Sequence, residues 1–228
     1  MLRGTTPRGG VRFGMRSLTT LTLLGAAAVV AACASRPRAG TLAGALARAR
    51  FPHADLARAP QQIVFRWRYS ETEGFASKGE GVARTAFPDS ARLDFFLDGG
   101  FGRGWAILLG DQLIIPGPDF VRRFIPPAPM LWAAVGRLAL PPARDTTARA
   151  SGDTLRADVG TAPVWRVTFV KDRLTRVDHI EGGRVVEWFT RSPEGAVRYV
   201  NEGGKRSLEL DVTRVQEVPG HDSAIWRR

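Results

Sequence analysis

The chain has 228 residues, of which 44% are hydrophobic and 24% charged, and a single cysteine, which excludes an intramolecular disulfide. The excess of 33 Lys and Arg over 22 Asp and Glu gives a net charge of +11. Because the basic residues are scattered singly rather than gathered in runs, we interpret them as solvated strand faces and expect no nucleic-acid partner. An anionic partner remains the alternative.

Residues 1–32 have the layout of a bacterial export signal. The uncharged stretch 18–32 is shorter than the roughly 17–25 residues that cross a bilayer as a helix. A basic segment followed by a short apolar stretch and small residues is typical of a secretory signal. Translation starts at Met1 or Met15, and the position of Met15 just before the apolar stretch favours Met15. The basic segment carries Arg3, Arg8, Arg12 and Arg16.

The apolar stretch ends in Val30-Ala31-Ala32-Cys33, which resembles the lipobox of bacterial prolipoproteins. The resemblance implies that the signal is cut before Cys33 and that the Cys33 thiol carries a lipid. It also implies that Ala34, standing where an aspartate would retain the protein at the inner membrane, directs it to the outer membrane. The alternative is that Cys33 is an ordinary residue beside a plain Ala-x-Ala cleavage site.

The 196 residues after the signal suit a single domain. We predict a tether at 33–41, the domain at 42–218 and a tail at 219–228. Apolar residues at helical spacing predict one amphipathic helix at the start of the domain, ending before Pro52. These residues are Leu42, Ala45, Leu46, Ala49 and Phe51.

From residue 61 onward the period of the apolar residues changes to two, which predicts antiparallel strands. In the first half, for example, Phe65, Trp67 and Tyr69 share one face, and Leu93, Phe95 and Leu97 share another. Turn residues separate the segments. We expect about ten or eleven strands: 61–69, 91–97, 105–109, 112–115, 154–159, 164–171, 174–181, 184–191, 196–201 and 207–218.

Residues 119–140 break the strand pattern. Their apolar spacing suits helical turns, and prolines at 126, 127 and 129 interrupt it. This predicts two short helices joined by a proline kink, whereas the polar residues 141–153 predict a loop.

No catalytic or metal-binding constellation is recognisable. His53, His179 and His221 are far apart in sequence, and none forms a metal-ligand pair. The dense glycines near 99–104 precede a strand rather than a helix, so they predict a hairpin tip rather than a phosphate loop. We therefore expect that the protein is not an enzyme and binds no metal ion or cofactor.

Apolar side chains on the inner face of such a sheet either fill a closed core or line a cavity, and strand periodicity does not distinguish the two. The candidate cavity-lining residues are Phe65, Trp67, Leu93, Phe95, Trp105, Ile107, Trp165, Val167 and Phe169.

A long antiparallel sheet with small helices over its mouth resembles the LolA/LolB/LppX superfamily of periplasmic lipid and lipoprotein carriers. That resemblance implies an α+β, mainly antiparallel fold: an incomplete β-barrel of about eleven strands with a small helical lid. Two segments resemble the membrane-anchored, LolB-like branch. One is the stretch from Ile125-Pro126 through Leu131-Trp132 to Gly136, which implies a lid containing Phe124, Leu131 and Trp132. The other is Phe101 on a glycine-rich hairpin, which implies a loop that contacts membrane or cargo; the alternative is that Phe101 folds back onto its hairpin.

The resemblance implies a periplasm-facing lipoprotein that is anchored in the outer membrane. It would bind acyl chains of lipoproteins or lipids in a hydrophobic cavity and receive them from a soluble periplasmic carrier. The alternative is a non-catalytic structural or envelope-assembly lipoprotein, with a filled interior, that binds a protein partner through its surface.

Overall fold

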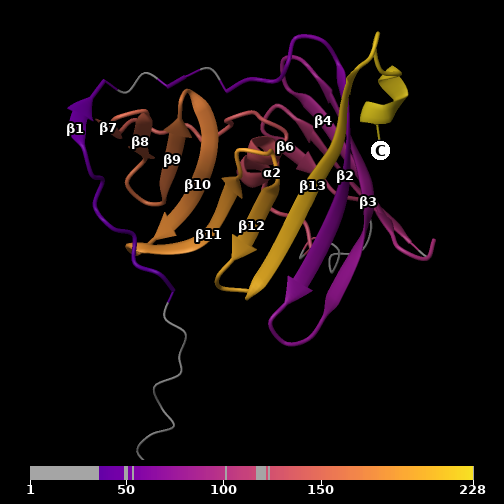
Figure 1. Ribbon diagram of the computed structural model, residues 1–228, viewed down its shortest axis with the longest axis horizontal. Coiled ribbons are helices and arrows are strands. Elements are labelled where there is room, and N and C mark those ends of the chain that lie inside the picture. The colour runs from indigo at the N-terminus through magenta and orange to yellow at the C-terminus, as the bar shows by residue number, and fades with distance from the viewer. Residues whose placement is uncertain are drawn as a thin grey trace, which may run out of the picture. The chain divides into compact units, whose positions relative to one another are not determined.

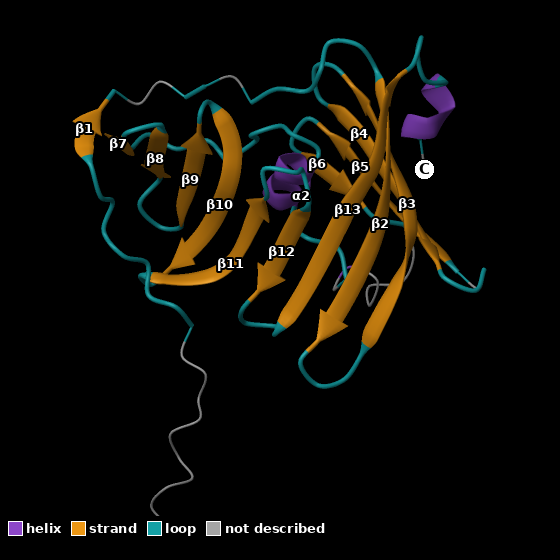
Figure 2. Cartoon of the chain, viewed as in Figure 1, coloured by secondary structure: helices purple, strands orange, loops and turns teal. Residues whose placement is uncertain are grey.

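A computed structural model of the protein describes residues 36–48, 51–52, 54–100, 102–116, 122 and 124–227. Residues 36–228 form one compact unit, which is built on a single antiparallel sheet (Figures 1 and 2). The sheet has thirteen strands in the order β1-β7-β8-β9-β10-β11-β12-β13-β2-β3-β4-β5-β6. Because β1 and β6 lie at opposite ends of this order, the sheet is open. This confirms the predicted incomplete barrel, with a few more strands than expected.

The strands are β1 (Ala45–Ala47), β2 (Gln61–Glu71), β3 (Ala76–Ala86), β4 (Ser90–Leu97), β5 (Arg103–Leu109), β6 (Gln112–Ile114), β7 (Thr146–Ser151), β8 (Thr154–Val159), β9 (Val164–Val170), β10 (Arg173–Glu181), β11 (Arg184–Arg191), β12 (Val197–Asn201) and β13 (Arg206–Glu217).

The inner face of the sheet carries the core. On β2 the side chains of Phe65, Trp67 and Tyr69 are buried, whereas Arg66 and Arg68 between them are exposed. Successive side chains of a strand point to opposite faces, so the predicted alternation correctly identifies the inner face here. The neighbouring strand β13 follows the same rule, since Leu208 pairs with Tyr69 and is buried.

Strand β3 was not expected, because its inner face is not hydrophobic. Gly79 and Gly81 stand opposite Trp67 and Phe65 of β2. A Cβ atom on Gly81 would collide with the Phe65 ring. One on Gly79 would collide with the carbonyl oxygen of Phe96 on β4 and would lie 3.1 Å from Cε2 of Trp67. The rings of β2 and the backbone of β4 therefore leave room only for glycine.

Two further segments differ from the prediction. The expected helix at 42–51 is wrong: Ala45–Ala47 forms the edge strand β1, which pairs with Ala148–Ala150 of β7. Strand β7 itself lies in the stretch predicted as a loop. Pairing with β1 satisfies the backbone groups that β7 would otherwise expose at the sheet edge. The hydrogen bonds of this pairing outweigh the weak helical preference of the segment.

The lid region contributes the short helix α2 (Ala128–Ala134), which lies within the curve of the sheet (Figure 1). The prolines at 127 and 129 stand at its first turn, where a missing amide proton costs least. Arg191 of β11 donates hydrogen bonds of 3.0 and 2.8 Å to the carbonyl oxygens of Ala133 and Ala134. The second expected helix is therefore α2, while much of the first falls on 117–121 and 123, outside the described residues.

The C-terminal segment packs against the outer face of β4. It forms the 3-10 helix η1 (Ser223–Trp226), and Nη1 of Arg92 on β4 donates a 2.9 Å hydrogen bond to the carbonyl oxygen of Ile225. Within the predicted tether, Arg38 makes an antiparallel β-bridge with Arg184.

Candidate functional site

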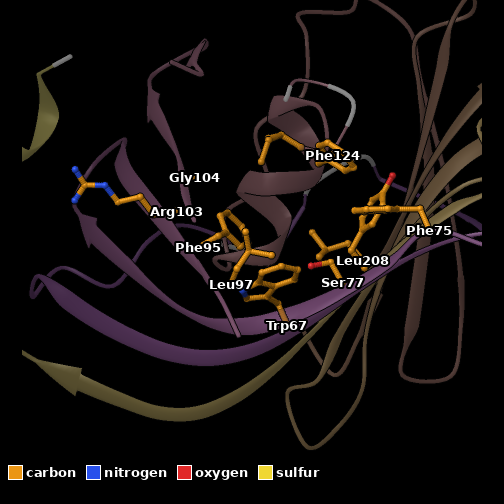
Figure 3. Close-up of a pocket in the computed structure, with 11 residues that line it drawn as sticks. Trp67, Phe75, Ser77, Phe95, Leu97, Arg103, Gly104, Phe124 and Leu208 are labelled. Atoms are coloured by element: carbon orange, nitrogen blue, oxygen red, sulfur yellow. The ribbon is translucent and has the colours of Figure 1, made fainter. Parts of the chain in front are cut away.

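An apolar pocket lies on the inner face of the sheet, close to one end of strands β2, β4 and β13. The strand register fixes its position, since Glu71 at the end of β2 pairs with Arg206 at the start of β13. Figure 3 shows the side chains that surround the pocket. The lining residues are Trp67, Tyr69, Phe75, Ser77, Phe95, Leu97, Arg103, Gly104, Phe124, Ile125 and Leu208.

Aromatic rings form the floor of the pocket. The ring of Trp67 meets that of Phe95 edge to face, with centroids 6.0 Å apart, and Phe65 meets Phe95 in the same way at 5.6 Å. The indole nitrogen of Trp67 donates a 3.0 Å hydrogen bond to the carbonyl oxygen of Glu80, so its one polar group is satisfied. These contacts fix a rigid apolar surface.

The cover of the pocket comes from the segment that precedes α2. Phe124 packs edge to face on Tyr69 with 5.1 Å between centroids, and its ring lies 5.6 Å from that of Phe75. Phe75 belongs to the β2–β3 turn and is 46% exposed. Ring contacts therefore join the cover to the sheet.

The pocket has a volume of about 240 Å³, just below the roughly 300–1,000 Å³ typical of small-molecule sites. Leu97 at its edge is 38% exposed, so the pocket opens to solvent there. Gly104 of β5 faces this space, and a Cβ atom added to it would meet no atom within 4 Å. The pocket therefore has room for a slender apolar group.

Charge is kept at the edges of the pocket. The Tyr69 hydroxyl donates a 2.7 Å hydrogen bond to Oε1 of Glu71, and burial together with this carboxylate raises the pKa of Tyr69 above its ordinary range. Tyr69 therefore stays neutral at physiological pH. The guanidinium of Arg103 points away from the other lining side chains (Figure 3). Such a pocket suits an apolar ligand.

The predicted cavity residues divide into three groups. Trp67 and Phe95 line the pocket, and Phe124 of the predicted lid covers it. The second group is buried in the packed core: Phe65, Leu93, Leu131, Trp132, Trp165, Val167 and Phe169. Most of the inner face is therefore filled, and the pocket occupies only one end of it.

Trp105 and Ile107 form the third group and lie on the opposite face of the sheet. Trp105 pairs with Asp94, and the guanidinium of Arg92 lies 4.5 Å from its ring centroid. The inner positions of β5 are instead Gly104, Ala106 and Leu108. The prediction for these two residues is corrected here, and the reason lies in the sequence: the apolar run of β5 shows no alternation that would identify its inner face.

Several lining residues were not predicted. Tyr69, Leu97 and Leu208 continue the alternation of strands already recognised, so their faces were visible in the sequence. Phe75 and Gly104 carry no such signal, because one lies in a turn and the other lacks a side chain. Cys33 and Phe101 fall outside the described residues.

A polar cluster lies on the inner face away from the pocket. Both oxygens of Glu187 are engaged: Oε2 accepts a 2.6 Å hydrogen bond from Tyr199, and Oε1 lies 2.9 Å from Nδ1 of His179. The Trp165 ring stacks on the His179 ring at 4.3 Å. Three polar side chains are thus paired with one another inside an apolar face, whereas Nε2 of His179 and Nε1 of Trp165 are buried without a hydrogen-bond partner among the described residues.

The described residues contain no group of three or more His, Cys, Asp or Glu side chains that could hold a metal ion. Among the same residues, no helix has both the length and the apolar character needed to cross a bilayer.

The fold is similar to one already seen in solved structures. The structure is similar to a LolA superfamily protein from Nitrosomonas europaea, with a TM-score of 0.51 and 8% sequence identity over 77% of this chain and 93% of that one. This likeness confirms the predicted fold.

Two other solved structures align with lower TM-scores. A Vibrio parahaemolyticus domain described as an outer membrane lipoprotein-sorting protein aligns at 0.48 with 9% identity, over 76% of this chain and 91% of that one. A DUF1329 family protein from Desulfovibrio piger aligns at 0.47 with 7% identity, over 75% and 90%. The sequence itself matches no protein-family model and no curated protein.

Proposed function

We propose that this chain, whose fold is similar to that of a LolA superfamily protein, is a membrane-anchored lipoprotein that binds an acyl chain in the pocket beneath Phe124. The observation that carries the proposal is the pocket itself: an apolar space lined by Trp67, Phe95 and Leu208, open at one edge and covered by a segment outside the sheet. Its chemistry requires a ligand without charge along its length.

Binding in this pocket follows from burial of apolar surface alone. Each methylene that leaves water contributes about 0.8 kcal/mol. A pocket of about 240 Å³ holds only part of a long acyl chain, so binding remains reversible. Movement of the Phe124 segment away from Tyr69 and Phe75 would open the pocket, and such motions commonly set the rate of ligand exchange.

In this proposal the lipid on Cys33 holds the protein at the periplasmic face of the outer membrane. Ala34 favours that membrane by resemblance to sorted lipoproteins. A protein fixed in one membrane suits the role of acceptor, so the cargo, an acyl chain of a lipoprotein or a free lipid, would arrive on a soluble periplasmic carrier. No step of this transfer needs a catalytic residue.

The experiment compares three forms of a soluble Cys33→Ala protein in titrations with a fluorescent long-chain fatty acid. Gly104→Leu extends a side chain from a pocket-lining position at which a Cβ atom meets nothing within 4 Å. Gly220→Leu is the matched control, since its Cβ position is equally open and lies in the C-terminal segment. We expect Gly104→Leu to weaken binding at least about tenfold, or 1.4 kcal/mol, with no effect of the control. Equal binding by all three forms, or none by the parent, would overturn the proposal.

One observation favours the alternative of a structural or assembly lipoprotein. Most of the inner face is a packed core, in which Phe169, Phe189 and Val177 are fully buried. Such a protein would act through its outer surface and would bind no fatty acid. Native mass spectrometry of the parent protein gives an independent reading, because a carrier retains lipid through purification and a filled domain does not.

A further inference from the structure

We propose that the segment following Cys33 is fixed to the sheet so that the mouth of the pocket faces the membrane holding the lipid anchor. The proposal rests on the lipid anchor of the proposed function, but not on acyl-chain binding. It concerns the interaction surface formed by the hairpins at the pocket end of the sheet, and the partner is a phospholipid bilayer.

The first observation is that the described chain is bound to the sheet almost from its beginning. The amide of Val185 donates a 2.9 Å hydrogen bond to the carbonyl oxygen of Pro37, and the amide of Ala39 donates one of 3.0 Å to Gly183. Between these bonds Arg38 forms its bridge with Arg184. The segment is therefore joined to the β10–β11 hairpin by an isolated β-bridge.

Arginine side chains hold the next residues of the segment. Nη1 of Arg166 donates a 2.6 Å hydrogen bond to the carbonyl oxygen of Gly40, and Nη1 of Arg149 donates one of 2.9 Å to that of Gly44. Arg166 is itself fixed by Asp158 at 2.7 Å. Strand β1 follows directly, so the described part of the segment, from Pro37 to Gly44, is bound to the sheet at several points.

The second observation is that this attachment lies at the pocket end of the sheet. The register joins Glu187 of β11 to Asn201 of β12, Asn201 to Arg206 of β13, and Arg206 to Glu71 of β2. The β10–β11 hairpin lies just beyond Glu187, as the β2–β3 hairpin lies just beyond Glu71. Figure 1 shows both hairpins and the first described residues on the lower side of the domain.

The third observation is the shortness of the free chain. Three residue steps separate Cys33 from Arg36, and they span at most roughly 10 Å when fully extended. Strand β2, by contrast, has 11 residues, which at 3.3 Å each make about 36 Å. A lipid at Cys33 therefore keeps the pocket end near the headgroups and holds the opposite end of the sheet away from them.

The surface that meets the bilayer is suited to it. Phe75, Phe96 and Leu97 lie on the two hairpins beside the pocket and are 46%, 44% and 38% exposed. Lys78 and Arg103 stand on the same hairpins, as do Glu73 and Asp98, and Lys78 pairs with Asp98 at 3.7 Å. The exposed apolar side chains, rather than a net positive charge, therefore favour the membrane interface. An acyl chain leaving the pocket would then enter the bilayer without crossing water.

The test uses the full lipidated protein in vesicles of phosphatidylethanolamine and phosphatidylglycerol. Acylation blocks the Cys33 thiol, so an introduced cysteine is the only site for a fluorescent label. Glu73→Cys places the label on the β2–β3 hairpin, and Glu194→Cys places it on the exposed turn between β11 and β12, at the opposite end. Quenching by headgroup-attached nitroxide lipids is then compared for the two positions.

We expect the Glu73 label to be quenched several-fold more strongly than the Glu194 label. A flexible Gly/Ser insertion of about twelve residues between Ser35 and Arg36 lengthens the free chain by roughly 20 Å and should reduce this difference. If the protein floats with the vesicles but the two labels are quenched equally, the proposed orientation is wrong and the anchor stands. If the protein does not float with the vesicles, it has no lipid anchor, and both proposals are wrong.

Discussion

The Tyr199 hydroxyl donates a 2.6 Å hydrogen bond to Oε2 of Glu187. Burial is the larger cause that raises the pKa of Tyr199 above its ordinary value, and the Glu187 carboxylate raises it further. The neutral phenol is therefore part of the folded state. Because Glu187 accepts from it inside an apolar face, removal of the hydroxyl leaves a buried carboxylate with one partner fewer. The pair joins β11 to β12 on the face opposite the solvent.

We predict that Tyr199→Phe lowers the free energy of unfolding by about 1–3 kcal/mol at neutral pH, the cost of an unsatisfied buried acceptor. Since the folded pKa is raised, the contribution of Tyr199 is fully present below its ordinary pKa of about 10 and is lost as pH rises through the folded pKa. Urea unfolding at pH 7 and above pH 10 measures both effects. The variant should lose less stability than the parent at high pH, and an unchanged loss would contradict the assignment.

The close approach of β2 to β3 gives a second prediction. A Cβ atom on Gly81 would collide with the Phe65 ring and lie 2.8 Å from the carbonyl oxygen of Asp94. Gly81→Ala should therefore destabilise the protein by about 1–3 kcal/mol through overpacking. Gly104→Ala is the matched control, because its added methyl group meets open space. Thermal unfolding should separate the two variants by several degrees, and equal melting temperatures would show that the rings can move aside.

The attachment of the lid helix gives a third prediction. Arg191 donates hydrogen bonds to the two carbonyl groups at the end of α2, and these bonds hold its guanidinium in place. Burial lowers the pKa of this guanidinium. Arg191→Met keeps the length of the side chain but removes both bonds, each worth about 1.5–3 kcal/mol when the donor is charged. We expect faster amide hydrogen exchange across Ala128–Ala134. Arg198→Met, at a mostly exposed position of β12, should leave that exchange unchanged. Equal rates in the two variants would exclude a role for Arg191 in fixing the lid.

Much of the fold is predictable because apolar and polar residues alternate along a strand that has one buried face. Phe65-Arg66-Trp67-Arg68-Tyr69 gives both the strand and its inner face, and both are confirmed. Strand β3 shows where this reasoning ends. Two of its inner positions are glycines, Gly79 and Gly81, because the Phe65 ring and the backbone of β4 leave no room for a side chain there. These glycines follow from the pairing of β3 with strands distant in sequence, so the sequence of β3 alone does not reveal the strand.

The site is less predictable than the fold for the same reason. Trp67 and Phe95 were expected to line a cavity, but so were Val167 and Phe169, which are part of a filled core. Alternation identifies the face on which a side chain lies, whereas the space in front of that face depends on what packs there. The Phe124 segment decides this, and its position depends on ring contacts between distant segments.

The last prediction concerns the cover of the pocket. Phe124→Ala removes the ring contacts with Tyr69 and Phe75, whose centroids lie 5.1 and 5.6 Å away, and each such contact contributes about 0.5–1.5 kcal/mol. We expect a bound fluorescent fatty acid to dissociate about tenfold faster, as measured by stopped-flow displacement with excess unlabelled fatty acid. Phe87→Ala is the matched control: Phe87 is 44% exposed and lies in the β3–β4 turn, at the end of β3 opposite the pocket. If both variants release the ligand at the rate of the parent, Phe124 does not retain it.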